Sequence, residues 1–321
     1  MDIDILLFFQ NIRTEFFATF MLQISELAEE LPLLILIAVI YWCIDKKSGI
    51  FTAFSFHISN LTYSVLKATF CVKRSWVRDT RIVPYEAAIE NATGFSFPSG
   101  HVVRTSSIMG SLAYTYRKYK SIMWLCIVFL LLTTFSRTYL GVHTPQDVLL
   151  GLFFPFLVIF LVKLLLDYID KHPTKDIYVL IIGSVLCVGA LFYFVYKSYP
   201  ADMDSATLTR GAFKNAGGVI GFLIAWFCER RWVKFETRGA LHQQIVKVII
   251  GAECIYLIMV PMYSWLGQIM DRQVAAFFKG LLTALFIFVI YPLIFSKILQ
   301  RINKKKEKNS QKNMEEQQVS A

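Results

Sequence analysis

Long apolar stretches, separated by short polar segments, recur along almost the whole chain and constrain its fold more than any other feature. Most approach the ~20 residues that an α-helix needs to cross the hydrocarbon core of a bilayer. A hydrophobic content of 56% in 321 residues agrees, because it is too high for a soluble domain of this size. The sequence therefore predicts an all-α fold, a polytopic membrane helix bundle with about nine spans. The stretches run at roughly 28–45, 50–70, 101–117, 121–139, 147–168, 177–197, 210–228, 243–264 and 273–297.

The first residues have a different pattern. Within 3–24, Phe9, Phe16 and Phe20 are interspersed with charged side chains such as Asp4 and Arg13. The mixture predicts an N-terminal amphipathic helix that lies at the membrane interface instead of crossing it.

Loop charge predicts the orientation of the bundle. The net charge of +10 is scattered between apolar runs, which argues against nucleic acid as a partner and favours basic cytoplasmic loops. With nine spans, the basic turns at 45–47, 117–120, 171–175 and 229–238 fall on one side together with the basic tail. The positive-inside rule makes that side, and the C-terminus, cytoplasmic. We therefore expect a multi-pass protein of the plasma (inner) membrane, with its remaining loops extracytoplasmic.

Three polar islands interrupt the apolar sequence. One island contains His143 and Asp147, which are four residues apart, so on a helical turn both side chains point to one face. A carboxylate there can hold one ring nitrogen of the histidine and leave the other free as a nucleophile or base. Arg137 offers a planar, always charged fork suited to phosphate oxygens. The other two islands are Pro98-Ser99-Gly100-His101 and the pair Lys67 and Arg74.

Together the islands resemble the type 2 phosphatidic acid phosphatase superfamily, whose signature is K-x6-R-P, then P-S-G-H, then S-R-x5-H-x3-D. The second and third motifs match at every fixed position, and the first matches at Lys67 and Arg74. Ser75 stands where the family has proline, so no charged group is lost. The motifs span 67–147, and the apolar stretches around them resemble the family's integral membrane branch.

The resemblance implies a role for each motif residue. His143 attacks phosphorus and becomes a phosphohistidine, while Asp147 fixes its tautomer and stabilises the imidazolium. His101 protonates the leaving oxygen and later activates the water that releases phosphate. No carboxylate cluster suggests magnesium or zinc, so a metal-independent reaction without a cofactor is expected. The residues that bind the phosphoryl oxygens are Lys67, Arg74, Ser99, Gly100 and Arg137, with a helix start at 99–101 adding backbone donors.

The expected function is hydrolysis of a lipid phosphate or diphosphate at the extracytoplasmic face. Polyprenyl diphosphate is slightly favoured over phosphatidate, phosphatidylglycerol phosphate and sphingoid-base phosphate, because the loops are compact and the site faces outward. A lipid phosphotransferase would use the same site. A haloperoxidase that uses bound vanadate has a similar site, but the haloperoxidase branch of the superfamily is soluble, whereas this chain is apolar. A non-catalytic phospholipid transporter or binding protein would need only the cations, whereas this chain also has two histidines and Asp147.

The motifs divide the chain into three parts. Residues 1–170 hold the expected phosphatase core, and 171–302 hold additional transmembrane helices whose role the sequence leaves open. Gly217, Gly218 and Gly221 predict close helix packing in this second part. Residues 303–321 are polar and basic and are expected to form a disordered cytoplasmic tail. The partners implied are the lipid phosphate substrate and membrane lipids, and the oligomeric state is left open.

Overall fold

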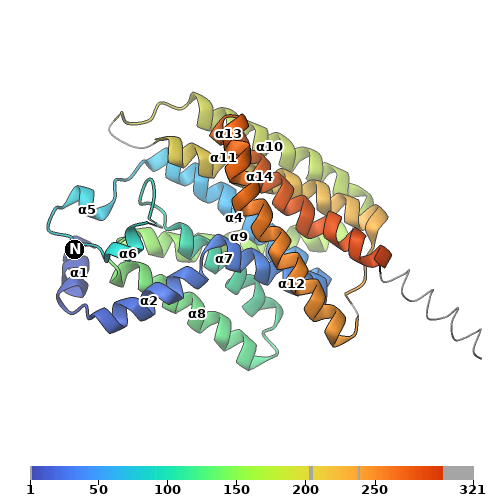
Figure 1. Cartoon of the computed structure of the whole chain (residues 1–321), viewed down its shortest axis with the longest axis horizontal. Coiled ribbons are helices and arrows are strands. Elements are labelled where there is room, and N and C mark those ends of the chain that lie inside the picture. Colours follow the sequence, from blue (N-terminus) through green and yellow to red (C-terminus); the bar gives the residue numbers. More distant parts are fainter. Residues whose placement is uncertain (1, 91, 202–204, 238, 299–321) are drawn as a thin grey trace, which may run out of the picture.

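The structure, a computed structural model, describes residues 2–90, 92–201, 205–237 and 239–298, and every regular element in these ranges is helical (Figure 1). The all-α prediction is therefore confirmed for these residues, whereas the expected tail at 303–321 lies outside them. The helices are α1 (Asp2–Asn11), α2 (Glu15–Leu27), α3 (Glu30–Val39), α4 (Lys46–Phe70), α5 (Ser75–Arg78), α6 (Glu86–Ile89), α7 (Gly100–Thr115), α8 (Lys120–Tyr139), α9 (Pro145–Lys171), α10 (Asp176–Tyr196), α11 (Ser205–Cys228), α12 (Leu241–Leu257), α13 (Tyr263–Ile269) and α14 (Arg272–Leu285). Four π-helical turns extend α3, α11, α12 and α14: Ile40–Ile44, Glu229–Val233, Ile258–Met262 and Phe286–Ile290.

The expected nine spans are not confirmed by length and hydropathy. Among the described residues, 6 helices are long and apolar enough to cross a membrane. A seventh span arises if α2 and the helix Glu30–Ile44, bent by 51° at their junction, cross together. The six are Lys120–Tyr139, Pro145–Lys171, Pro173–Tyr196, Ser205–Val233, Leu241–Ile269 and Arg272–Ile298.

Helices α4 and α7 explain most of the difference. Both are rich in buried polar side chains, such as Ser55, Asn60 and Ser64 in α4 and Thr105 and Ser111 in α7. They pack on each other and on α9, with α11 also against α4. A helix surrounded by other helices needs no continuous apolar surface, so its hydropathy falls below that of a lipid-facing helix. Helix α7, with 16 residues, is in addition short for a span.

The N-terminal segment forms two helices instead of the single one expected over 3–24. The chain turns at Ile12–Thr14, between α1 and α2, and both helices pack against α8. Phe8, Phe16 and Phe20 remain 58%, 85% and 41% exposed. Their position at a membrane interface stays a prediction.

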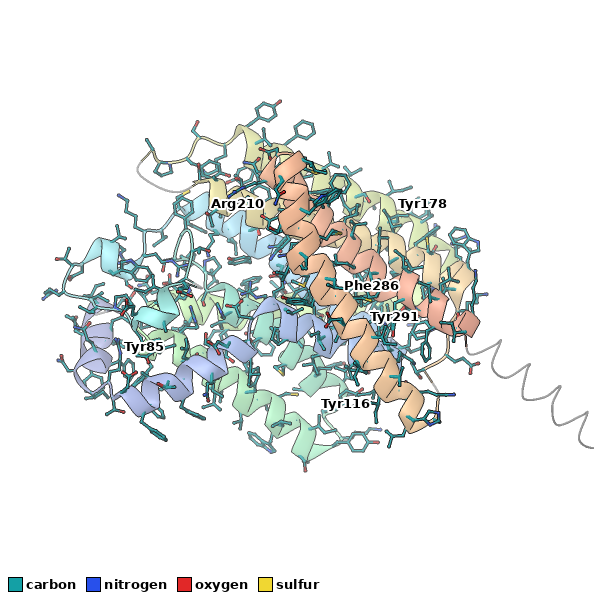
Figure 2. The ribbon with its side chains drawn as sticks, viewed as in Figure 1. Tyr85, Tyr116, Tyr178, Arg210, Phe286 and Tyr291 are labelled. Atoms are coloured by element: carbon teal, nitrogen blue, oxygen red, sulfur yellow. The ribbon has the colours of Figure 1, made fainter. Side chains whose placement is uncertain are left out.

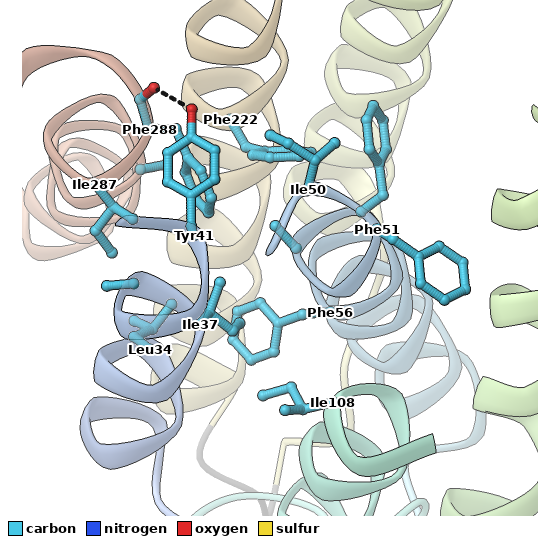
Figure 3. Packing of buried hydrophobic residues seen from close by; sticks show 14 of the residues in the cluster. Leu34, Ile37, Tyr41, Ile50, Phe51, Phe56, Ile108, Phe222, Ile287 and Phe288 are labelled. Atoms are coloured by element: carbon cyan, nitrogen blue, oxygen red, sulfur yellow. Dashed lines mark hydrogen bonds between the residues drawn. The ribbon is translucent and has the colours of Figure 1, made fainter. Parts of the chain in front are cut away.

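One apolar core joins the two parts of the sequence. Figure 3 shows Leu34 of α3, Phe56 of α4 and Ile108 of α7 in the same cluster as Phe222 of α11 and Phe288. The early and late helices therefore fold against each other, although the motifs occupy only the early ones. The boundary near 170 is a division of sequence pattern, and it stays a prediction.

Two hydrogen bonds fasten this core at a π-helical turn. The Tyr41 hydroxyl donates to the Phe288 carbonyl at 3.0 Å (Figure 3), and the Trp42 indole donates to the Ile287 carbonyl at 2.8 Å. The regular i→i−4 pattern is broken in a π-helical turn. Buried polar groups in a membrane need protein partners, so these bonds hold α3 against the end of α14.

The long helices carry apolar outer faces. Leu125 of α8, Leu157 and Phe160 of α9, and Val185 of α10 are between 59% and 70% exposed. Exposed apolar surface of this extent marks contact with lipid in a chain with several candidate spans. The protein is therefore an integral, multi-pass membrane protein.

The links that carry polar motifs gather at one end of the bundle. Segment 71–99, with α5 and α6, lies at the left of Figure 1, and the first turns of α11 lie at the upper left, beside the end of α4. In Figure 2, Tyr85 and Arg210 lie toward that end, whereas Tyr178 lies toward the other. The motif loops and the first turns of α11 are thus neighbours in space.

Candidate active site

A cavity of about 370 Å³ opens at the loop end of the bundle. Four cations line it: Lys67 at the end of α4, Arg74 in the following loop, Arg104 on α7, and Lys214 on α11. The two histidines of the motifs line it as well. The remaining lining residues are Glu29, Glu30, Tyr63, Ser64, Glu90, Thr93, Gly94, Gly100, Thr207, Leu208, Gly211, Ala212 and Asn215.

His143 is held from both sides of its ring. Nδ1 lies 3.4 Å from Asp147 Oδ2, and Nε2 lies 3.1 Å from Arg74 Nη1. Because a guanidinium can only donate, Nε2 must accept, which assigns the ring hydrogen to Nδ1. Burial, reinforced by the charge of Arg74, lowers the pKa of His143 well below its ordinary value despite the opposing effect of Asp147. The residue is therefore a neutral imidazole with its lone pair on Nε2.

Asp147 is fixed by more than the histidine. Its Oδ2 accepts hydrogen bonds from the Ser96 hydroxyl at 2.6 Å and from the Thr144 amide at 2.8 Å. It is the third residue of α9, where a carboxylate caps the free amides of the first turn. The sequence placed His143 and Asp147 on one helical turn. The structure instead places His143 before the helix, and the cap brings the two side chains together.

Arg74 is gripped by loop carbonyls. Its Nε donates to Gly94 O at 2.9 Å, Nη2 to Thr93 O at 2.7 Å, and Nη1 to Val142 O at 3.2 Å. Burial lowers its pKa from 12.5 to about 10, which still leaves the guanidinium charged at neutral pH. A cation is thus held in one orientation beside Nε2 of His143.

Lys67 and Gly100 meet at Tyr63. The Lys67 ammonium donates to the Tyr63 hydroxyl at 3.0 Å. A β-carbon on Gly100 would lie 2.9 Å from the same oxygen, closer than van der Waals contact allows. Helix α7 begins at Gly100, as predicted, so the glycine lets the helix start approach the lysine.

His101 has a carboxylate partner that the sequence analysis missed. Its Nε2 lies 2.7 Å from Glu29 Oε1, and the other Glu29 oxygen lies 3.7 Å from Arg104 Nη2. Glu29 precedes α3, 72 positions from His101, and no motif marks it. Only the folded chain brings the two together.

Ser99 and Arg137 are buried motif residues with free polar atoms. The Ser99 hydroxyl, and Nε and Nη2 of Arg137, find no partner among the described residues. The remaining Arg137 nitrogen bonds the Ser25 hydroxyl, another residue that the sequence did not flag. Neither motif residue is among those that line the cavity. Unpaired buried donors of this kind fit an anion that accepts from them.

Ser75, which replaces the family's proline, joins two motif loops. Its hydroxyl donates to the Gly141 carbonyl at 3.0 Å, and its side chain is fully buried. Gly141 has φ +78°, a conformation that favours glycine, and precedes His143 by two residues. The first motif is thereby connected to the loop that presents the histidine.

The described residues contain no group of three or more His, Cys, Asp or Glu side chains suited to a metal ion. The cavity lining combines two imidazoles and four cations with three carboxylates, and two of these carboxylates, Glu29 and Glu30, are paired with His101 and Lys214. This donor set suits a phosphate anion better than a metal.

Two family models match the chain. The PAP2 superfamily model matches residues 49–171, which contain the three motifs. A second, described as PAP2 superfamily phosphatase, transmembrane extension, matches residues 213–305. The later helices, whose role the sequence left open, thus carry a recognised pattern of their own.

Two relatives are similar over part of their length. Phosphatidylglycerophosphatase B of Bacillus subtilis (strain 168) is 31% identical over 142 residues, covering 41% of this chain and 66% of the relative. Undecaprenyl-diphosphatase of Sulfolobus acidocaldarius is 32% identical over 109 residues, covering 33% of this chain and 49% of the relative. The chain therefore spans less than two thirds of either relative.

Among solved structures, the chain is similar to the crystal structure of the first transmembrane PAP2 type phosphatidylglycerolphosphate phosphatase from Bacillus subtilis. The two are 27% identical, with a TM-score of 0.42. The match covers 52% of this chain and 85% of the other.

Proposed function

Because this chain belongs to the PAP2 superfamily, as its motifs indicated, we propose that it is a membrane lipid phosphatase acting through the cavity around His143. One observation carries the proposal: His143 lies between Asp147 on one ring nitrogen and Arg74 on the other. A neutral imidazole beside a fixed cation is suited to attack a phosphoryl group whose oxygens the cation binds.

The first half of the reaction starts at Nε2 of His143. A phosphoryl group enters the cavity and replaces Arg74 as the neighbour of Nε2, while Arg74, Lys67 and the Gly100 amide bind its oxygens. Ser99 and Arg137 lie outside the cavity lining, and their unpaired buried donors are proposed to reach the same oxygens from within the protein. Nε2 then forms a bond to phosphorus while the bond to the leaving oxygen breaks. Asp147 stabilises the imidazolium that results, so the intermediate is a phosphohistidine.

His101 serves the leaving oxygen. To act as the acid, His101 is proposed to be doubly protonated when the anionic substrate is bound: Nε2–H donates to the Glu29 carboxylate, and Nδ1–H gives its proton to the departing group, which leaves a neutral ring. In the second half, His101 takes a proton from water, the oxygen of which attacks phosphorus. The bond to His143 breaks and inorganic phosphate leaves.

The substrate is proposed to be a lipid phosphate or diphosphate. The two relatives are named for phosphatidylglycerophosphate and undecaprenyl diphosphate, and both molecules carry a phosphoryl group at the end of a lipid. Polyprenyl diphosphate stays the favoured member, with phosphatidate and sphingoid-base phosphate as further candidates. The reaction uses no metal, since the proposed machinery consists of side chains alone.

Phosphate release by the purified protein in detergent tests this function. The panel consists of a polyprenyl diphosphate, phosphatidate, phosphatidylglycerophosphate and a sphingoid-base phosphate. At least one should be hydrolysed, with turnover unchanged by EDTA and inhibited by vanadate, which mimics five-coordinate phosphorus. Binding without release would favour a transporter or binding protein, and transfer to an added lipid alcohol would identify a phosphotransferase. Activity that disappears in EDTA and returns with magnesium would contradict the mechanism.

The site is proposed to face the extracytoplasmic side, opposite the basic turns. Two exposed residues are suited to the test: Ala87 of α6 and Lys118 between α7 and α8. Native Cys71 is a partly buried free thiol at the end of α4, so the test uses a Cys71→Ser background. There, a cysteine at Ala87 should react with a membrane-impermeant maleimide in intact cells. A cysteine at Lys118 should react only after permeabilisation. The reverse pattern would invert the topology and make cytoplasmic lipid phosphates the candidates.

A further inference from the structure

The cavity has a second wall that the motifs do not supply. Lys214 and Asn215 line it from α11, opposite the ends of α4 and α7. Both residues lie within the part of the chain that matches the transmembrane extension. The extension therefore contributes side chains to the active-site cavity itself.

The start of α3 connects this wall to the catalytic residues. Glu29 and Glu30 are consecutive, and their side chains diverge: Glu29 bonds His101, while Glu30 forms an ion pair with Lys214. The side chains of Glu30 and Lys214 are each about one-fifth exposed. Two consecutive residues thus connect Lys214 and His101, the proposed acid for the leaving oxygen, and both of these side chains line the same cavity.

Lys214 is also held rigidly by its neighbours. A β-carbon on Gly280 of α14 would lie 2.0 Å from the Lys214 carbonyl oxygen, so the two backbones are in direct contact. The next residue, Asn215, donates to the Ser64 hydroxyl at 2.9 Å and to Asn60 O at 3.2 Å. Ser64 lies one turn before Lys67 on α4. The backbone of α11 is therefore fixed on both sides at this point, and the ion pair with Glu30 holds the Lys214 ammonium.

The charge at this wall favours an anion. Lys279 of α14 and Lys214 both line a small second cavity around Glu30, so two lysines surround a single carboxylate there. A negatively charged group that approaches from the active-site cavity would bring the net charge of Glu30, Lys214 and Lys279 closer to zero.

We infer that Lys214 binds the leaving group of the substrate, so that the extension determines which lipid phosphates the enzyme accepts. This inference rests on the proposed function. A lipid monophosphate leaves as an alcohol, which needs only a proton from His101. A lipid diphosphate leaves as a lipid monophosphate, which carries negative charge in the transition state. A cation beside the leaving oxygen therefore accelerates diphosphates selectively.

The test uses farnesyl diphosphate and farnesyl phosphate, which share one lipid and differ in the leaving group. Lys214→Gln/Glu30→Gln removes the ion pair and leaves Lys279 as the remaining charge of this cluster. We expect kcat/KM for the diphosphate to fall about tenfold to a hundredfold, the range for a lost charge-assisted hydrogen bond. The value for the monophosphate should change less than about threefold. The matched control, Lys163→Gln/Asp167→Asn, removes an exposed ion pair on α9 and should alter neither value.

Equal losses on both substrates, or no loss on either, by a correctly folded variant would overturn the assignment of Lys214. A wild-type protein that cleaves neither substrate would instead count against the proposed function. If the double variant does not fold, Lys214→Gln alone decides the question, because Glu30 then keeps Lys279 as a neighbouring cation. It should show the same selective loss on the diphosphate, and equal losses on both substrates, or none on either, would overturn the inference.

Discussion

Purified His143→Ala is expected to release phosphate from lipid substrates at least about 10⁴-fold more slowly than the wild type, while folding normally. The substitution removes the attacking atom, so nothing else at the cavity can replace it. Asp147→Asn should also be severely slowed but measurably active, because the amide keeps contact with Ser96 while losing the charge that stabilises the imidazolium. Brief incubation with radioactively labelled substrate should leave acid-labile label on the wild type and none on His143→Ala.

Asp167→Asn is the matched control for Asp147→Asn, since it makes the same change on the same helix at an exposed site. Its turnover should stay near the wild-type rate. Near-normal turnover by His143→Ala would eliminate the phosphohistidine mechanism, whatever the other variants do.

The pH profile provides a second check on His143. Burial and the charge of Arg74 lower its pKa, so the ring stays deprotonated as the pH falls through the ordinary histidine value of about 6.5. His143 becomes protonated, and so loses its nucleophilic lone pair, only when the pH falls below this lowered pKa. The acid limb of kcat/KM that belongs to His143 should therefore lie well below pH 6.5.

His101→Ala is expected to have the second-largest effect, and its size should depend on the leaving group. For a lipid alkyl phosphate the loss should be about 10²–10⁴-fold, the usual contribution of a general acid. For an aryl phosphate analogue the loss should be much smaller, because a phenolate departs without a proton. Hydrolysis rates of the two substrates by wild type and variant measure the difference.

Glu29→Gln is the companion variant, since it keeps the side-chain shape and a hydrogen-bonding group beside His101. It should lower alkyl phosphate hydrolysis by about tenfold, less than the loss of the imidazole. A His101→Ala variant that loses the same factor on both substrates would show that His101 is not the acid.

The helical class and the membrane setting could be predicted from the sequence because lipid-facing helices such as α9 and α10 contain long apolar runs. The number of spans could not, because hydropathy reports the environment of a surface and α4 and α7 are surrounded by protein. The break between α1 and α2 was also missed. Its residues, Ile12 to Thr14, include neither glycine nor proline to mark a turn.

The motif residues could be singled out because a phosphate site needs cations and histidines where the surrounding sequence is apolar. Their roles stay predictions. Glu29, Ser96 and Tyr63 could not be found in the same way, because single carboxylates and hydroxyls are common and acquire meaning only through distant neighbours. Lys214 was missed for a related reason: it lies 71 residues beyond His143, in a part of the chain without motifs.

The bond between Ser75 and Gly141 has a consequence for how such chains are detected. Proline is well suited to the first residue of a short helix, which is where Ser75 lies in α5. Serine fills the same position by a different means, a hydroxyl that reaches across to the loop before His143. A search pattern that insists on proline would reject this chain, although its cations and histidines are all in place. A pattern that accepts either proline or serine after the arginine would retain this chain. It would also distinguish the charged motif residues, which the site needs, from the residue that only supports the backbone and can be replaced.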